Sequence, residues 1–128
     1  MDIEIPESWD FREEYPHCKA ASTPTITQDC HASYVLSTLS AAEDRICKGG
    51  SGERVQLSSQ ELIDCDKFSE CARGTVNKVL NWGKRRGFVA EHCYPSTGKQ
   101  GECPDEHLEE NDCRISNEFY RVVDFCIA

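Results

Sequence analysis

The sequence predicts a single α+β domain that is mainly helical and has loops tied together by disulfide bonds. Its 128 residues suit one domain with a modest core, so residues 1–128 are interpreted as one unit. Hydrophobic residues make up 38% of the chain, which is typical of a globular protein and too many for a disordered one. Nine cysteines are scattered along it, between helical patterns and short apolar segments.

The cysteines indicate disulfides rather than a metal site. Zinc sites usually contain close pairs such as Cys-x-x-Cys, and this sequence has no such pair. So many cysteines are typical of proteins from an oxidising compartment, which predicts a secretory, lysosomal, vacuolar or extracellular location. An odd count leaves one thiol free or bound to another chain. We expect neither a metal nor a cofactor.

Charge and hydropathy exclude two classes of partner. The formal net charge of −9 argues against nucleic acid, because phosphate binding needs clustered Lys and Arg. The one basic cluster, Lys84-Arg85-Arg86, falls at a predicted helix end, where cations offset the macrodipole. No stretch approaches the length of a membrane-spanning helix. The first residues carry neither a basic segment nor an apolar run, so we expect a mature or excised portion of a precursor.

The first half of the chain contains the longest predicted helix. Residues 1–29 are predicted to be irregular, because prolines interrupt any regular pattern. A central helix is expected within 30–47, where the stretch from Ala32 to Cys47 has no Gly or Pro. Its apolar residues cover more than one face, which predicts a long, largely buried helix. The glycine-rich residues 48–52 should end it with a flexible turn.

Two shorter helices are predicted next. Ser58 and Glu61 form a capping-box pattern, which opens a short helix that runs through Cys65. The stretch 75–86 is amphipathic, with apolar residues at i, i+3, i+4 and i+7, and Gly87 ends it. Both patterns place an apolar face against the rest of the domain.

The last third of the chain has weaker signals. Residues 88–89 and 119–125 are expected to be extended, because they are short apolar segments rich in Phe and Val. Residues 95–128 are otherwise predicted to form a cysteine-tied loop and tail, since most of this stretch is polar.

Several short motifs then occur in order along the chain. They are Ile5-Pro6-Glu7-Ser8-Trp9-Asp10-Phe11-Arg12-Glu13, Arg12-Glu13-Glu14-Tyr15-Pro16-His17-Cys18, Glu43-Asp44-Arg45-Ile46-Cys47, Leu57-Ser58-Ser59-Gln60-Glu61-Leu62-Ile63-Asp64-Cys65, and Gly87-Phe88-Val89 followed by Cys93-Tyr94-Pro95. Up to about residue 103 the chain resembles the N-terminal (left) domain of papain-type cysteine peptidases of the cathepsin B kind. The resemblance implies a papain-like fold without its right-hand β domain.

The resemblance also implies a set of disulfides. The implied pairs are Cys18–Cys47, Cys30–Cys71, Cys65–Cys103 and Cys93–Cys113. Cys126 is then the candidate for the odd cysteine. Sequence alone does not determine such connectivity.

The family motif Gln-Gly-x-Cys-Gly-Ser-Cys-Trp-Ala-Phe-Ser resembles residues 27–37, and this places Ser33 at the nucleophile position. Papain-type catalysis uses a thiolate at a helix N-terminus, and a serine hydroxyl is far harder to ionise. An alternative takes Cys30 as the nucleophile, but it breaks the family spacing to the other cysteines. The oxyanion glutamine would correspond to Gln28 if one residue is deleted, or to Thr27 without a gap.

The residues that would line the substrate groove have also changed. His31 stands where the family has a glycine between the two motif cysteines. The Cys-x-Gly-Gly turn of the family corresponds to residues 71–74, so Arg73 replaces a glycine and Gly74 remains. With Tyr34, which follows the nucleophile position, these residues are the predicted substrate-groove positions.

These changes predict a non-catalytic papain-fold protein, or pseudoprotease, that serves as a structural or interaction element. The family takes its catalytic His and an orienting Asn from a later β-rich domain, and none of the histidines here has that context. We therefore expect another protein chain, possibly the C-terminal half of the same precursor, to cover the inter-domain face. One alternative is a two-chain papain-type peptidase, active or silenced. Another is a zinc-binding interaction module that uses some of Cys65, Cys71, His92 and Cys93.

Overall fold

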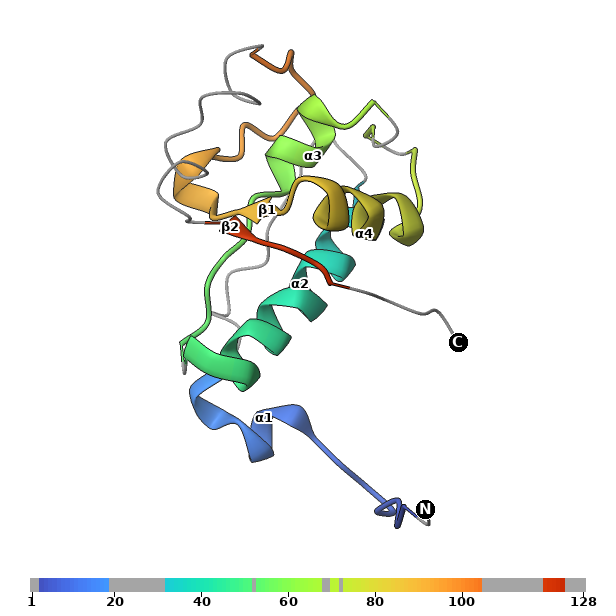
Figure 1. Ribbon diagram of the computed structural model, residues 1–128, viewed down its shortest axis with the longest axis vertical. Coiled ribbons are helices and arrows are strands. Elements are labelled where there is room, and N and C mark those ends of the chain that lie inside the picture. The colour runs from blue at the N-terminus through green and yellow to red at the C-terminus, as the bar shows by residue number, and fades with distance from the viewer. Residues whose placement is uncertain are drawn as a thin grey trace.

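The computed structural model describes residues 3–18, 32–51, 53–67, 70–71, 73–104 and 119–123. Helices dominate these residues, and a small two-stranded sheet accompanies them, so the predicted mainly helical α+β architecture is confirmed. In Figure 1 the helix α2 (Ser33–Ile46) runs through the centre. Helices α3 (Ser59–Cys65) and α4 (Val76–Arg85) pack against it, while α1 (Phe11–Glu14) lies beyond its C-terminal end.

The N-terminal segment is more regular than predicted. It contains α1 and a 3₁₀ turn, η1 (Pro16–Cys18), within the stretch 1–29 that was expected to be irregular. Asp10 caps α1 by accepting a hydrogen bond from the backbone N–H of Arg12 at 2.8 Å. Pro16 was expected to interrupt regular structure, but it is the first residue of η1. At the first position of a helix the N–H has no partner within the helix, so proline loses no hydrogen bond there.

The central helix α2 begins at Ser33 and continues past its end at Ile46 as a π-helical turn, η2 (Cys47–Ser51). The expected flexible glycine turn is therefore wrong, and the disulfide from Cys47 to Cys18 holds the turn at its start. The helix buries Val35, Thr38 and Leu39, while its other side chains are half-buried or exposed. It is central but less buried than its composition suggested.

Helix α3 confirms half of the predicted capping box. The Ser58 hydroxyl accepts a hydrogen bond from the Glu61 N–H at 3.2 Å, as an N-cap should. The Glu61 side chain does not follow the capping-box pattern, because it turns inward and accepts a hydrogen bond from Trp82 Nε1 at 3.3 Å. The Ser58 N–H instead donates to the carbonyl of Val89 at 2.8 Å. The first turn of α3 is thus built into the core.

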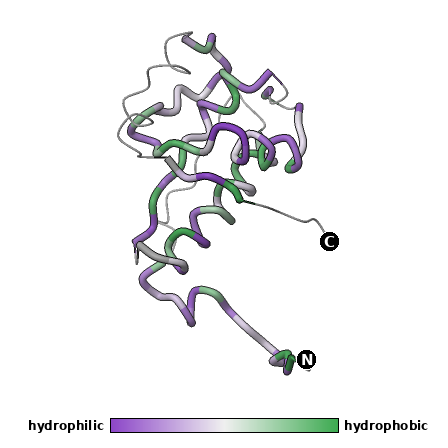
Figure 2. Tube along the Cα trace, viewed as in Figure 1, coloured by the Kyte–Doolittle hydropathy of each residue, from purple (hydrophilic) through white to green (hydrophobic). Residues whose placement is uncertain are grey.

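Helix α4 has the predicted bounds to within a residue at each end. Thr75 is its N-cap and Gly87, with φ of 81°, follows its end. A Cβ on Gly83 would lie 2.6 Å from the ring of Phe88 and 2.6 Å from Val122, so the glycine permits the helix to approach these residues closely. Figure 2 shows hydrophobic and hydrophilic stretches alternating along α2 and α4, as amphipathic helices require.

The sheet joins two segments far apart in the sequence. Strand β1 (Phe88–Val89) pairs antiparallel with β2 (Phe119–Tyr120). The extended segment predicted at 119–125 is therefore a strand only in its first two residues; residues 124–125 lie outside the described part. The core around the sheet and helices consists of Ala32, Val35, Leu39, Leu57, Leu62, Ile63, Val79, Trp82 and Phe88.

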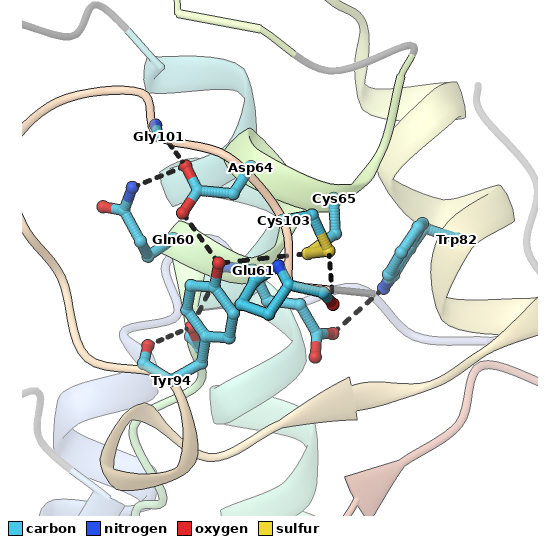
Figure 3. Close-up of a disulfide and its surroundings, with 10 residues drawn as sticks. Gln60, Glu61, Asp64, Cys65, Trp82, Tyr94, Gly101 and Cys103 are labelled. Atoms are coloured by element: carbon cyan, nitrogen blue, oxygen red, sulfur yellow. Dashed lines mark hydrogen bonds between the residues drawn. A yellow bond between two sulfur atoms is a disulfide. The ribbon is translucent and has the colours of Figure 1, made fainter. Parts of the chain in front are cut away.

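The loop 95–104 is fixed to α3 by covalent and polar contacts (Figure 3). A disulfide joins Cys65 to Cys103, and the Asp64 carboxylate accepts hydrogen bonds from the Tyr94 hydroxyl at 2.8 Å and the Gly101 N–H at 2.7 Å. Burial first, and then the bond to Asp64, raise the pKa of Tyr94 above its ordinary value. Nothing among the described helices is long and apolar enough to cross a bilayer.

Candidate functional site

The predicted nucleophile position lies at the N-terminus of α2. Ser33 is the first residue of the helix and is exposed. Ala32 precedes it; the Ala32 carbonyl accepts from the N–H groups of Val35 at 3.0 Å and Leu36 at 3.1 Å, but its methyl side chain cannot cap the helix. The positive end of the helix dipole therefore lies at Ser33, where it would favour a thiolate. A serine hydroxyl is neutral at this position, so the same dipole gives it little help.

Tyr34 connects the start of α2 to the turn at residues 70–73. Its hydroxyl lies 2.6 Å from the carbonyl oxygen of Glu70 and 2.7 Å from that of Arg73, so one proton is shared between two acceptors. Glu70 and Arg73 also bond to each other through their backbones, at 2.8 and 3.1 Å. The side chain predicted to face the groove is thus half-buried and is used to hold this turn.

Gly74 lies directly against the Tyr34 ring. A Cβ at Gly74 would lie 2.6 Å from the Tyr34 hydroxyl oxygen and closer still to two ring carbons. Arg73, the neighbouring predicted groove residue, is exposed. The structure therefore brings Tyr34, Arg73 and Gly74 together at one end of α2. Gln28 and His31, the other predicted site residues, lie outside the described residues.

The position of His17 excludes it as a base for Ser33. His17 precedes Cys18, which is bonded to Cys47, one residue beyond the C-terminal end of α2. Ser33 is at the opposite end of this 14-residue helix, about 20 Å away along its axis. His92 lies in the 3₁₀ turn η3 (Glu91–Cys93), which follows β1. His107 lies outside the described residues, as does His31.

The observed disulfides exclude the zinc alternative. Two of the pairs that the family resemblance implies are present, Cys18–Cys47 and Cys65–Cys103, with Cα–Cα distances of 5.8 and 4.8 Å. Cys71 and Cys93 are also disulfide-bonded, and their implied partners, Cys30 and Cys113, lie outside the described residues. The three cysteines proposed as zinc ligands are therefore all in disulfides, which leaves His92 as the one remaining proposed ligand.

A second group of side chains consists of residue types that can bind a metal ion. In the part of the chain that the structure describes, the ligand atoms of His17, Cys18 and Cys47 lie within 4.8 Å of one another. Both sulfurs are joined in a disulfide, which removes the thiolates that would bind a metal.

Replacing Tyr34 with Phe is expected to lower the free energy of unfolding by about 1 kcal/mol, because it removes the hydroxyl that donates to both carbonyls and leaves each with its backbone N–H partner. The amides of Glu70 and Arg73 should then exchange faster with deuterium, a change that NMR can measure. Tyr15→Phe is the matched control, since Tyr15 lies at the other end of the molecule and its ring packs on Phe11. Unchanged exchange at both amides would show that the hydroxyl does not hold the turn.

Comparison with known proteins identifies the family. The model of the papain family of cysteine proteases matches residues 5–124. The cathepsin B-like protein CP3 of Giardia intestinalis is 29% identical over 130 residues, which cover 95% of this chain and 42% of the relative. The chain thus spans less than half the length of the curated relatives it matches.

Solved structures show the same fold. The procathepsin B S9 of Trypanosoma congolense has a TM-score of 0.69 at 26% identity, covering 80% of this chain and 38% of that one. The cysteine protease CMS1MS2 of Carica candamarcensis, solved in complex with E-64, has a TM-score of 0.62 at 28% identity and covers 77% and 45% of the two chains.

Proposed function

The chain belongs to the papain family of cysteine proteases, and we propose that it is a non-catalytic member that serves as a structural or interaction element of a larger assembly. The observation that carries the proposal is the exposed Ser33 at the N-terminal end of α2, a residue that the motif resemblance predicts to stand in place of the nucleophile. A hydroxyl has a far higher pKa than a thiol, and it needs a base and an oxyanion hole arranged for it.

Two further features support this proposal. His17 is held at the far end of α2 by the Cys18–Cys47 disulfide, so it cannot act as a base for Ser33. Arg73 occupies a position where the family motif has a glycine, and its exposed side chain stands beside Gly74. Both features favour a protein that retains the papain fold but does not hydrolyse peptides.

The proposal is tested with the chain and its Ser33→Cys variant, each incubated with fluorogenic peptides and a thiol-reactive epoxide. We expect no hydrolysis by either protein, since restoring the thiol does not supply an imidazole to deprotonate it. Ser37→Cys is the matched control, because Ser37 is an exposed serine one turn further along α2. The epoxide should label both variants, and it should label the Ser33→Cys thiol faster by at most about tenfold, because the helix dipole favours a thiolate there but no imidazole takes the proton. Hydrolysis by the unaltered chain would contradict the proposal.

A second candidate is one chain of a two-chain papain-type peptidase. It rests on the family motif, in which the catalytic His and an orienting Asn come from a later β-rich domain that the second chain would supply. Native mass spectrometry of the protein isolated from its source distinguishes the two. A co-purifying chain with the family's His and Asn motifs supports the second candidate, and any other composition supports the first.

We further propose that another protein chain covers the open face of α2. An apolar groove of about 580 Å³ lies there, between α2, α4 and the segment after β2, and Val123 at its edge is 90% exposed. Apolar surface of this kind marks interaction sites. The disulfides also favour an oxidising compartment as the place of action.

A further inference from the structure

A small pocket beside Gly74 is positively charged, although the chain as a whole is acidic. It has a volume of about 280 Å³ and is lined by Lys67, Glu70, Arg73, Gly74, Thr75 and Lys78. Three of these side chains are cationic and one is anionic, whereas the whole chain has 14 Lys and Arg against 23 Asp and Glu. The pocket therefore reverses the sign of charge that predominates on the molecule.

The backbone that carries these charges is held in place. Glu70 and Arg73 form a two-way backbone bridge, and the Tyr34 hydroxyl bonds to both of their carbonyls. Thr75 caps α4 by accepting a hydrogen bond from the Lys78 N–H at 3.4 Å, which fixes Lys78 one turn into the helix. A ligand that binds here pays less to order the surrounding backbone than it would on an unstructured loop.

We propose that this pocket binds an acidic segment of a protein partner, with a Glu or Asp side chain placed between Arg73 and the two lysines. A guanidinium pairs with a carboxylate through two parallel hydrogen bonds, and the lysines add charge without demanding geometry. Because the whole chain has a formal net charge of −9, it attracts an acidic ligand only where cations cluster, as they do in this pocket. The inference rests on the proposed non-catalytic function, because the segment is held and not cleaved.

The probe is a fluorescein-labelled alanine hexapeptide with two central glutamates, compared with its counterpart carrying two glutamines. Fluorescence anisotropy at low salt should show tighter binding of the glutamate peptide. Arg73→Gln should weaken that binding about two- to fivefold, as expected for one exposed charge pair. Glu70→Gln should strengthen it by a similar factor, because it removes a like charge while the backbone of Glu70 still bonds to Tyr34. A misfolded variant would not bind more tightly.

Arg85→Gln is the matched control, since Arg85 is an exposed arginine in the last turn of α4, about 14 Å along the helix from its start. It should leave the affinity unchanged, and raising the salt to about 0.5 M should remove the preference for glutamate. Equal binding of the two peptides, or changes of the same sign in the Arg73 and Glu70 variants, overturns the inference. Mass spectrometry of the same samples tests the other proposal separately. A cleaved peptide contradicts the non-catalytic function, whereas an intact peptide bound without preference contradicts only the acidic-segment site.

Discussion

Replacing Arg54 with Met is expected to lower the free energy of unfolding by about 3 kcal/mol at neutral pH, because it leaves a buried carboxylate without its cation. The Arg54 guanidinium pairs with Glu43 at 3.0 Å and with Asp44, and it donates to the Cys18 carbonyl at 3.3 Å. The side chains of Arg54 and Glu43 are only 13% and 12% exposed. After the substitution, Glu43 would keep only the hydrogen bond from the Leu57 N–H at 2.9 Å.

The stability that the Arg54→Met variant loses should depend on pH, and the pKa of Glu43 fixes the direction of this dependence. Burial raises the pKa of Glu43 above its ordinary value, while the Leu57 N–H and the charge of Arg54 partly lower it. Without Arg54 that pKa rises further. A carboxyl whose pKa is higher in the folded state stabilises the fold at pH values below its unfolded pKa. This stabilisation is lost as the pH rises through the folded pKa. The difference between the variant and the unaltered protein should therefore be smaller at about pH 4 than at about pH 7.5.

Urea unfolding at the two pH values measures both effects. Arg12→Met is the control, because Arg12 also pairs with a carboxylate, Asp10 at 2.7 Å, but is 73% exposed. The Arg12→Met substitution should leave the urea concentration at the midpoint of unfolding unchanged at either pH. If the Arg54 and Arg12 variants behave alike, the buried pairing does not stabilise the fold.

The second large effect is expected on removal of the Cys65–Cys103 disulfide. The double substitution Cys65→Ala, Cys103→Ala should lower the free energy of unfolding by roughly 3 to 4 kcal/mol, because the bridge closes a loop of 38 residues and restricts the unfolded chain. The loop 95–104 would then be held to α3 mainly through Asp64 and Gln60. Hydrogen exchange at the Gly101 amide, measured by NMR, should become faster.

A second double variant separates a local effect from a global one. Cys18→Ala, Cys47→Ala removes a bridge of similar span, 29 residues, at the other end of α2. It should cost a similar amount of stability but should leave Gly101 more protected than the first variant does. Equal exchange at Gly101 in the two variants would show that Asp64, and not the disulfide, fixes the loop.

The helices were predictable where a local signal marks their ends. Ser58 is an N-cap in both the sequence and the structure, and the apolar spacing of residues 76–83 gives α4 correctly, although Thr75, predicted as its first residue, is its N-cap. Local sequence patterns gave wrong predictions where a contact with a residue far away in the sequence determines the structure. The glycines after Cys47 normally end a helix, but the disulfide to Cys18 holds a further turn in place. Likewise Glu61 fits a capping box, but burial draws its carboxylate to Trp82.

The candidate site was predictable in its position and not in its contacts. The motif around Ser33 places it at the start of a helix, and the structure has it there. The hydroxyl of Tyr34 bonds to residues 36 and 39 positions further along the chain, and no local pattern announces such a contact. Lys67 and Lys78 reach one pocket from different segments, so its charge becomes visible only when the chain is folded.

The close packing of Gly74 against Tyr34 also limits how this sequence can evolve. With the Tyr34 ring in place, no side chain larger than hydrogen fits at Gly74. Conversely, a residue without a hydroxyl at position 34 would remove the donor that the Glu70 and Arg73 carbonyls share, and would leave this turn with its backbone hydrogen bonds. A larger residue at position 74 is therefore expected only in related sequences whose side chain at position 34 is smaller than Tyr.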